Sequence, residues 1–191
     1  IYLIEAGPRL LAGMSEESSA HAEQFLREMG VNILLNKRVV DYRDHKVVLE
    51  DGTEIATRTF IWVSGVTGVT IGNLDASLIG RGGRIKVDSF NRVEGMNNVF
   101  AIGDQCIQLA DENYPNGHPQ LAQVAIQQGE LLAKNLIRME KGQEMKPFHY
   151  RNLGSMATVG RNRAVAEFSK VKMQGWFAWV MWLVFHLRFV Y

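Results

Sequence analysis

The sequence predicts an α/β fold, and three patterns along the chain carry this prediction. A helical pattern lies between two short apolar segments within residues 1–35, an order typical of a βαβ unit. Alternating apolar residues with turn signals at 38–56 predict a β-meander. A third apolar segment, Val99 to Ile102, ends directly in Gly103 and Asp104. We therefore expect parallel strands covered by helices, together with a meander.

The composition of the 191 residues describes an ordinary globular surface. The formal net charge is +1 and 21% of the residues are charged, which argues against a general nucleic-acid binder. Cys106 is the sole cysteine, so no disulfide can form within these residues. We expect Cys106 to pack in the core rather than to act as a nucleophile. The five histidines show no metal-ligand spacing, so the sequence predicts neither a metal site nor a nucleophilic catalytic residue.

The first part of the chain has the order strand, helix, strand. Residues 1–4 are an apolar strand, and Ser15 can cap a helix from Glu16 to Met29. Gly30 is the expected C-terminal stop of that helix, and residues 31–35 form the next strand. Because the chain begins inside a strand without an initiator Met, we expect a fragment of a longer protein.

A meander and a further strand follow. Residues 38–42, 46–50 and 53–56 are the expected meander strands, joined by turns. Thr59 to Val63 is predicted to be another buried strand. The glycines that punctuate residues 65–83 mark the crossing into a second domain.

The second domain is predicted to contain strands at Arg84–Val87 and Val99–Ile102. The second of these has no polar residue, so we expect it to be buried on both faces. Gly103 lets the chain turn and lets a ligand approach, and the Asp104 carboxylate can accept hydrogen bonds from neighbouring sugar-type hydroxyls. An ordinary Gly-Asp turn is the alternative interpretation.

A helix is predicted from Pro119, as the first helical residue, to about Arg138. Gln120, Gln123 and Gln127 follow the spacing i, i+3 and i+7, so they are expected to form one stripe. A neutral amide donates and accepts hydrogen bonds without changing its protonation, which suits a site where a cofactor changes charge. A solvated glutamine-rich face is the alternative.

The C-terminal part is basic and aromatic. Residues 141–191 carry eight Lys or Arg against two acids, a balance that anionic lipid surfaces attract. Trp176, Trp179 and Trp182 recur within an apolar run that is too short to span a bilayer. We expect a helix that lies in the membrane interface, with a buried helix or a dimer-interface helix as the alternative.

Four segments resemble one family of flavoproteins, the type II NADH:quinone oxidoreductases. These segments are Ile1 to Glu5, Ile61 to Val66, Val99-Phe100-Ala101-Ile102-Gly103-Asp104 and Ala122-Gln-Val-Ala-Ile-Gln-Gln128. The resemblance covers essentially the whole chain but only the later part of such a protein. It implies a partial flavoprotein with two Rossmann-like domains, FAD and NAD as cofactors, and a C-terminal membrane-interface helix.

The resemblance also implies roles for individual residues. Glu5 would accept hydrogen bonds from the adenosine ribose of NADH, although Arg9 lies near enough to tolerate a phosphate. Gly65 would allow the nicotinamide to approach, and Gly103 and Asp104 would bind FAD. Two further roles fall on the first part of the predicted helix. Gln120, Leu121 and Ala122 would hold the flavin, and Gln123 and Gln127 would face the quinone.

The expected reaction passes electrons from NADH through the flavin to a membrane quinone, without proton pumping. The expected division is 1–66 for the second half of an NADH-binding domain, 67–148 for the returning half of an FAD-binding domain, and 149–191 for the membrane-facing segment. The fragment is expected to be inactive alone, and the whole protein to lie on the cytoplasmic face of a bacterial inner membrane, with a homodimer left open. A soluble disulfide or ferredoxin reductase and a non-catalytic, membrane-tethered nucleotide-binding protein are the alternatives.

Overall fold

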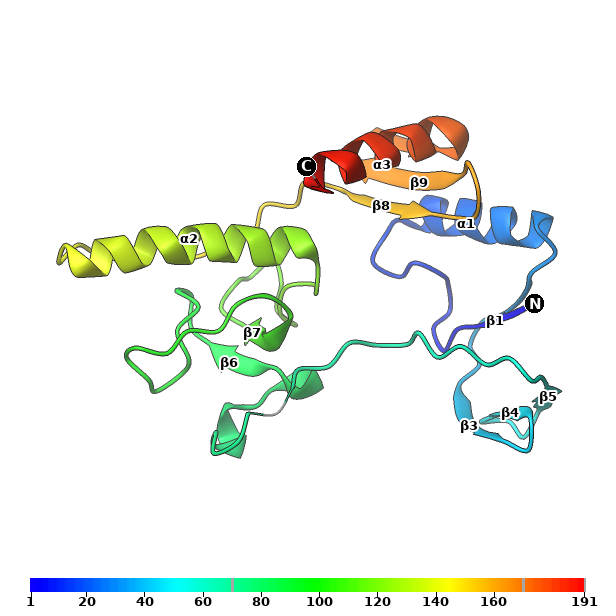
Figure 1. Cartoon of the computed structure of the whole chain (residues 1–191), viewed down its shortest axis with the longest axis horizontal. Helices are drawn as coiled ribbons and strands as arrows, with labels where there is room; N and C mark the ends of the chain where they lie inside the picture. The colour runs from blue at the N-terminus through cyan, green and yellow to red at the C-terminus, as the bar shows by residue number, and fades with distance from the viewer. Residues whose placement is uncertain (70, 170, 191) are drawn as a thin grey trace. The chain divides into compact units, whose positions relative to one another are not determined.

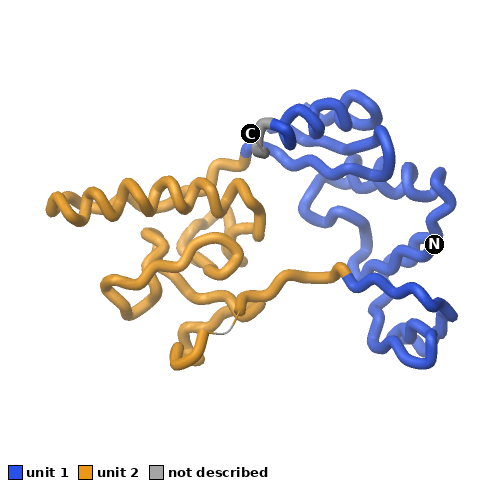
Figure 2. The backbone as a smooth tube through the Cα atoms, viewed as in Figure 1, with its two compact units in different colours: residues 1–62, 153–191 blue, residues 63–152 orange. Residues whose placement is uncertain are grey.

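A computed structural model describes residues 1–69, 71–169 and 171–190 of the chain. The chain forms two compact units, coloured separately in Figure 2. Unit 1 contains Ile1–Trp62 and Leu153–Tyr191, and unit 2 contains Val63–Asn152. The helices and the parallel strand pairs described below confirm the predicted α/β class.

Unit 1 begins with the expected βαβ arrangement. Strands β1 (Tyr2–Ile4) and β2 (Asn32–Leu34) pair in parallel, and α1 (Glu16–Glu28) connects them. The Ser15 side chain caps α1 by accepting a hydrogen bond from the Ser18 N–H at 3.3 Å. Gly30 follows the helix with φ +80°, a left-handed conformation that glycine adopts without strain. Both predicted ends of this helix are therefore confirmed to within one residue.

The meander is also confirmed. Strands β3 (Val39–Arg43), β4 (Lys46–Leu49) and β5 (Glu54–Ala56) pair antiparallel in the order β3-β4-β5. Val47 and Leu49 of β4 are buried, while ion pairs such as Lys46 with Glu54 (2.6 Å) line the outside. The alternation of buried and exposed residues is what made these strands visible in the sequence.

The strand predicted at Thr59 to Val63 is wrong. This segment pairs with no strand among the described residues, and the side chains of Ile61 and Val63 are 74% and 88% exposed. Phe60 alone turns back to the meander, where its ring stacks on Tyr42 with centroids 4.9 Å apart. An apolar run becomes a buried strand only where neighbouring strands satisfy its backbone groups and cover its faces.

The second part of unit 1 is a sheet that the sequence pattern did not reveal. Strands β8 (Ser155–Thr158), β9 (Ala164–Phe168) and β10 (Val171–Gln174) are antiparallel with β9 in the centre. Helix α3 (Gly175–Val190) packs over this sheet (Figure 1). The fully buried residues of the core between them are small, and larger, partly buried side chains pack against them. The small residues are Ala164, Ala166 and Ala178.

Unit 2 is built around a parallel pair, β6 (Ile85–Val87) and β7 (Cys106–Gln108), with the long helix α2 (Ala122–Glu140). The strand predicted at Val99–Ile102 is wrong, because this segment forms only an isolated bridge between Phe100 and Arg92. Val99 is 47% exposed, so the segment is not buried on both faces. The strand that enters the sheet is β7, a few residues later.

Helix α2 begins later than predicted. Its first residue is Ala122 and its N-cap is Leu121, so Pro119 is not the first helical residue. Gln120 therefore lies in the turn before the helix, and the expected helical stripe is reduced to Gln123 and Gln127. The turn at Pro119 is closed instead by the Leu121 N–H, which donates to the Pro119 carbonyl at 3.0 Å.

Candidate functional site

The Gly103-Asp104 turn is held directly against α2. Gly103 starts a single 3₁₀ turn, Gly103–Gln105, with φ +66°. A Cβ atom at Gly103 would lie 3.3 Å from the Cβ of Ala125 on α2, so both the conformation and the close approach favour glycine. The next residue, Asp104, is the middle residue of this turn and is exposed.

The start of α2 lies beside the same turn. The Gln120 amide donates to the Asp104 carbonyl oxygen at 3.3 Å, and no side chain caps the helix at Leu121. The structure therefore brings together the five predicted residues Gly103, Asp104, Gln120, Leu121 and Ala122. An exposed carboxylate beside an uncapped helix N-terminus offers hydrogen-bond acceptors for hydroxyl groups and a positive partial charge for an electron-rich ring. These groups fit the sugar-like chain and the ring edge of FAD.

Gln128 is a residue of this site that sequence reasoning missed. Its side chain is buried, and its Oε1 atom accepts a hydrogen bond from the Gly103 N–H at 2.7 Å. Its Nε2 atom lies 3.6 Å from the Sγ of Cys106. Gln128 is the second glutamine of the Gln-Gln pair in the sequence. Helical spacing places Gln128 off the stripe predicted for Gln120, Gln123 and Gln127, so it was not singled out.

Cys106 has the structural character expected of it. Its side chain is buried, and its Sγ lies 3.5 Å from the Gly103 carbonyl oxygen. Burial raises the pKa of the Cys106 thiol, which disfavours the reactive thiolate. Cys106 therefore packs beneath the turn and is not a candidate nucleophile.

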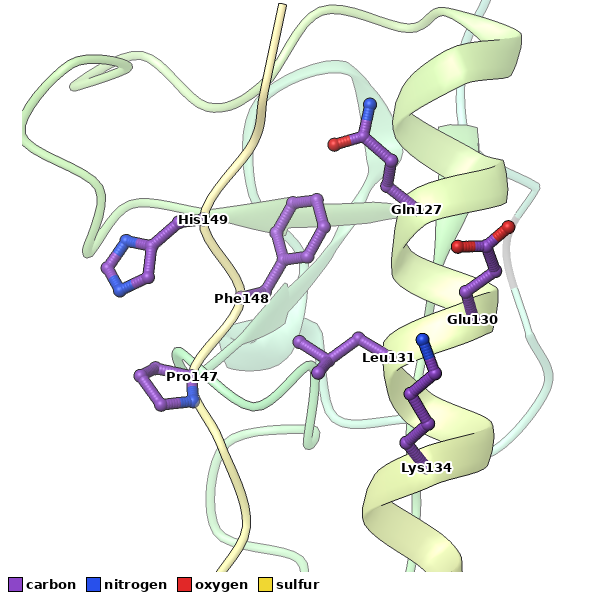
Figure 3. A pocket seen from close by; sticks show the side chains of 7 residues that line it. All are labelled: Gln127, Glu130, Leu131, Lys134, Pro147, Phe148 and His149. Atoms are coloured by element: carbon purple, nitrogen blue, oxygen red, sulfur yellow. The ribbon is translucent and has the colours of Figure 1, made fainter.

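Gln127 makes two hydrogen bonds to one backbone position. Its Nε2 donates to the Arg151 carbonyl at 2.9 Å, and its Oε1 accepts from the Arg151 N–H at 3.0 Å. It also lines a shallow groove of about 270 Å³ between α2 and residues 147–149 (Figure 3). Gln123, one turn earlier, is half-buried and makes contacts of its own. The groove and both glutamines belong to unit 2.

The end of β1 in unit 1 carries Glu5, whose Oε1 accepts a hydrogen bond from the Gly7 N–H at 2.7 Å. The nearby Arg9 is not free, because its guanidinium donates to the carbonyl oxygens of Met14 (2.7 Å) and Ala12 (2.8 Å). Gly65 lies in an exposed irregular segment with φ +79° and no other atom near its Cβ position. Glu5 and Gly65 belong to different units.

A buried polar set close to α2 was not predicted. His118 and Asp111 are both buried, and the Nε2 atom of His118 lies 2.9 Å from the Oδ2 of Asp111. Arg84, also buried, donates to the His118 carbonyl at 3.2 Å and to the Cys106 carbonyl at 2.6 Å. The spacing of these residues carries no motif, so sequence reasoning had no signal for the set. Among the described residues, no three His, Cys, Asp or Glu side chains gather as a metal site would require.

Helix α3 has one packed face and one exposed face. Trp179 packs with the alanine core on β9, whereas Trp176 is 56% exposed and Trp182 stacks on His186 with centroids 4.4 Å apart. Among the side chains of this helix that the structure describes, the exposed apolar ones are Trp176, Phe177, Val184, Phe185 and Leu187. Within the described residues, no helix has both the length and the apolar character needed to cross a membrane.

Comparisons with known proteins identify relatives of this chain. The family model for pyridine nucleotide-disulphide oxidoreductases matches residues 1–129. The chain is 35% identical to the type II NADH:quinone oxidoreductase NdhA of Mycobacterium tuberculosis, with all of this chain and 42% of that protein covered. It is 33% identical to the mitochondrial internal alternative NAD(P)H-ubiquinone oxidoreductase A1 of Arabidopsis thaliana, with 95% of this chain and 38% of that protein covered. The predicted resemblance to type II NADH:quinone oxidoreductases is thereby confirmed.

A solved structure supports the fold. The chain superimposes on NDH2 from Plasmodium falciparum in complex with NADH with a TM-score of 0.86 at 19% identity, covering all of this chain and 54% of that one. Among the curated relatives, NdhA included, the chain spans about two fifths of the length of the proteins that it matches.

Proposed function

Because this chain belongs to the pyridine nucleotide-disulphide oxidoreductase family, we propose that it is part of a flavoprotein that transfers electrons from NADH to a quinone. Its relatives carry that activity in their names. The assignment of 1–66 to an NADH-binding domain, 67–148 to the returning half of an FAD-binding domain and 149–191 to a membrane-facing segment belongs to the same proposal.

One observation carries the proposal: the exposed residue Asp104 lies in a turn that is bonded to Gln120, next to a start of α2 that no side chain caps. Gly103 permits this approach, and Gln128 locks the turn from behind. In the proposed complex, Asp104 accepts hydrogen bonds from the flavin's sugar-like chain. The first residues of α2 then hold the pyrimidine edge of the ring, where the helix dipole favours negative charge.

When bound, FAD would supply the redox chemistry that connects hydride transfer from NADH to two-electron reduction of the quinone. The chain's own residues bind and orient the reactants. Glu5 accepts hydrogen bonds from the ribose of NADH and repels a 2′-phosphate. Since Arg9 is held by backbone carbonyls, it does not offset that repulsion, which favours NADH over NADPH. Gly65 leaves room for the nicotinamide.

Gln123 and Gln127 are proposed to line the path of the quinone. Both lie on the first turns of α2, directly after the residues assigned to the flavin. An amide can hydrogen-bond a quinone carbonyl in either redox state. The Gln127 bonds to Arg151 hold the amide in one orientation, which pre-organises this side of the site.

The exposed face of α3 is proposed to rest on a membrane surface. Trp176 and Phe177 are amphipathic or apolar side chains that favour the interface, and residues 141–191 carry eight Lys or Arg against two acids. Trp179 points to the sheet instead and serves packing. An interfacial helix of this kind would bring the site to a substrate that dissolves in the bilayer.

The decisive experiment on the flavin site uses the intact protein with Asp104→Ala and Asp104→Asn. We expect Asp104→Ala to lose flavin on dialysis, since unpaired hydroxyl groups cost about 1 to 3 kcal/mol. Asp104→Asn keeps one acceptor oxygen and should retain more flavin than Asp104→Ala. Flavin absorbance per protein is the measurement, and unchanged occupancy in both variants would reduce Gly103-Asp104 to an ordinary turn.

A second experiment addresses the membrane surface. Trp176→Ser with Phe177→Ser should reduce binding to vesicles that contain phosphatidylglycerol and should slow reduction of long-tailed quinones. Reduction of a small soluble acceptor should be spared, because such an acceptor reaches the flavin from water. A wild-type protein that reduces no quinone and binds no vesicle would instead be a soluble reductase of the same family.

A further inference from the structure

The turn that leads into α2 is fastened by a buried histidine. His118 is 2% exposed, immediately precedes Pro119 and lies three residues before the N-cap Leu121. Three separate contacts reach this one residue: a side-chain hydrogen bond with Asp111, a backbone hydrogen bond from Arg84 and an aromatic enclosure. Buried polar groups are stable only when they are hydrogen-bonded, so these contacts fix the position of His118.

The first contact is the pair with Asp111. The Nε2 atom of His118 lies 2.9 Å from the Oδ2 atom of Asp111, and this hydrogen bond lowers the pKa of the Asp111 carboxyl. A carboxylate only accepts hydrogen bonds, so in this contact the Nε2–H of His118 is the donor. Asp111 uses its other oxygen to accept the Asn113 N–H at 3.0 Å. The loop from Asp111 to His118 is therefore closed at both ends by one carboxylate.

The second contact fixes the backbone of His118. The buried Arg84 guanidinium donates to the His118 carbonyl at 3.2 Å and to the Cys106 carbonyl at 2.6 Å. Cys106 is the first residue of β7 and lies beneath the Gly103 turn. Arg84 therefore ties the turn before α2 to the strand that follows Asp104.

The third contact is the aromatic enclosure of the imidazole. Its ring lies 5.1 Å from Tyr114, 5.2 Å from Phe148 and 5.9 Å from Tyr150, measured between centroids. These rings exclude water, so the ring cannot exchange the Asp111 contact for a water molecule at low cost. The position of the imidazole is therefore set by the Asp111 bond and the three surrounding rings, while its buried Nδ1 atom makes no hydrogen bond within the described part of the chain.

We propose that His118 is a positioning residue: with Asp111 and Arg84 it holds the turn from Gly117 to Leu121 so that the backbone N–H groups at the start of α2 point at the flavin. This role rests on the function proposed above. The N-cap Leu121 makes no side-chain cap hydrogen bond, so in this proposal the helix start is held by the preceding turn rather than by a cap of its own.

The test compares three variants of the intact protein. His118→Phe keeps a ring but removes the donor to Asp111, while His118→Gln retains a donor near the Nε2 position. Phe148→Leu is the matched control, because it disturbs the same aromatic enclosure and leaves the bonds of His118 to Asp111 and Arg84 intact. Thermal unfolding first establishes that the control loses about as much stability as His118→Phe.

The informative readout is hydrogen exchange of the Leu121 and Val124 amides, measured without flavin. We expect His118→Phe to accelerate exchange there by about tenfold, the equivalent of one lost hydrogen bond. His118→Gln should restore slow exchange, and Phe148→Leu should not change it selectively. Equal acceleration in His118→Phe and Phe148→Leu, or none in either, would overturn the proposal.

A second readout separates this proposal from the proposed function. In the flavin-loaded protein, His118→Phe should alter the visible spectrum and the midpoint potential of the flavin, with His118→Gln close to wild type. If the wild-type protein takes up no flavin, the proposed function fails while the exchange result still decides the role of His118. A local exchange effect with an unchanged flavin spectrum would limit His118 to the fold and reject the link to the flavin.

Discussion

Gln128 and Gly103 lie 25 residues apart in sequence and are joined by a 2.7 Å hydrogen bond, in which the Gly103 N–H donates to the Gln128 side chain. This bond couples the central part of α2 to the turn that presents Asp104. The position of the proposed flavin ligand therefore depends on a buried amide on another element.

Replacing Gln128 by Leu is expected to destabilise unit 2 by about 1 to 3 kcal/mol, because the Gly103 N–H loses its acceptor. Flavin retention should fall with it. Chemical unfolding and flavin absorbance are the measurements. Gln105→Leu is the matched control, since Gln105 lies in the same turn but bonds to Val69 at the surface. This control should lower the free energy of unfolding by less than Gln128→Leu does. Equal losses for both variants would contradict the coupling.

Glu5→Gln is expected to raise the relative use of NADPH without making it the preferred donor. The substitution removes the charge that repels a 2′-phosphate, but it supplies no cation. Arg9 stays bonded to backbone carbonyls, and Lys37 is paired with Asp51. The ratio of kcat/KM for NADH and NADPH is the measurement. A full reversal of preference would show that Arg9 leaves its carbonyl partners to bind phosphate.

Gln127→Leu is expected to slow quinone reduction more than flavin reduction by NADH. The variant loses a hydrogen-bonding amide beside the proposed quinone path and frees the backbone at Arg151. Stopped-flow flavin reduction and steady-state quinone reduction separate the two steps. Equal slowing of both half-reactions would mean that Gln127 only supports the fold.

Ala178→Leu is expected to destabilise unit 1 by about 1 to 3 kcal/mol, because the added atoms overpack the contact of α3 with Ala164 and Ala166. Phe177→Ser is the neighbouring control: Phe177 is 71% exposed, so its loss should leave the unfolding free energy almost unchanged. Denaturant unfolding measures both. Similar losses would show that the two faces of α3 are not distinguished as the structure describes.

The Asp111 carboxyl should make stability depend on pH. Its pKa is lowered in the folded protein by the hydrogen bond from His118, whereas an unfolded Asp titrates near about 3.9. The carboxylate therefore favours the folded state above that pH, and this contribution is lost as the pH falls toward the folded-state pKa. The Tm of wild type should fall more steeply than that of Asp111→Asn between about pH 5 and pH 3. Parallel curves would contradict the pairing.

Local pattern predicted the elements whose signals lie within a few residues. The Ser15 cap, the Gly30 stop and the alternation around Val47 belong to this class, because capping and side-chain periodicity act through neighbouring residues. Local pattern failed at Thr59 to Val63 and at Val99, where burial depends on which strands are adjacent. An apolar run has the same appearance in sequence whether or not partners cover it.

The candidate site divides in the same way. The residue types at Gly103, Asp104 and Gln120 to Ala122 were predicted from sequence and from resemblance, and the structure places them side by side. The bonds that hold them were not predicted, since Gln128, Arg84 and the pair of Asp111 with His118 approach the site from distant positions. No spacing rule relates such residues.

The sequence by itself determined which helix and turns form near their caps, which family the chain belongs to, and which residue types could bind a flavin. Only the tertiary structure decided that α2 starts at Ala122, that Arg9 is occupied by carbonyls, and that α3 turns Ala178 inward and Phe177 outward. The physical reason is the distance along the sequence between the residues that interact. Caps and periodicity are set by contacts between near neighbours, whereas burial and hydrogen-bond partnership are set by whichever distant segments the fold brings into contact.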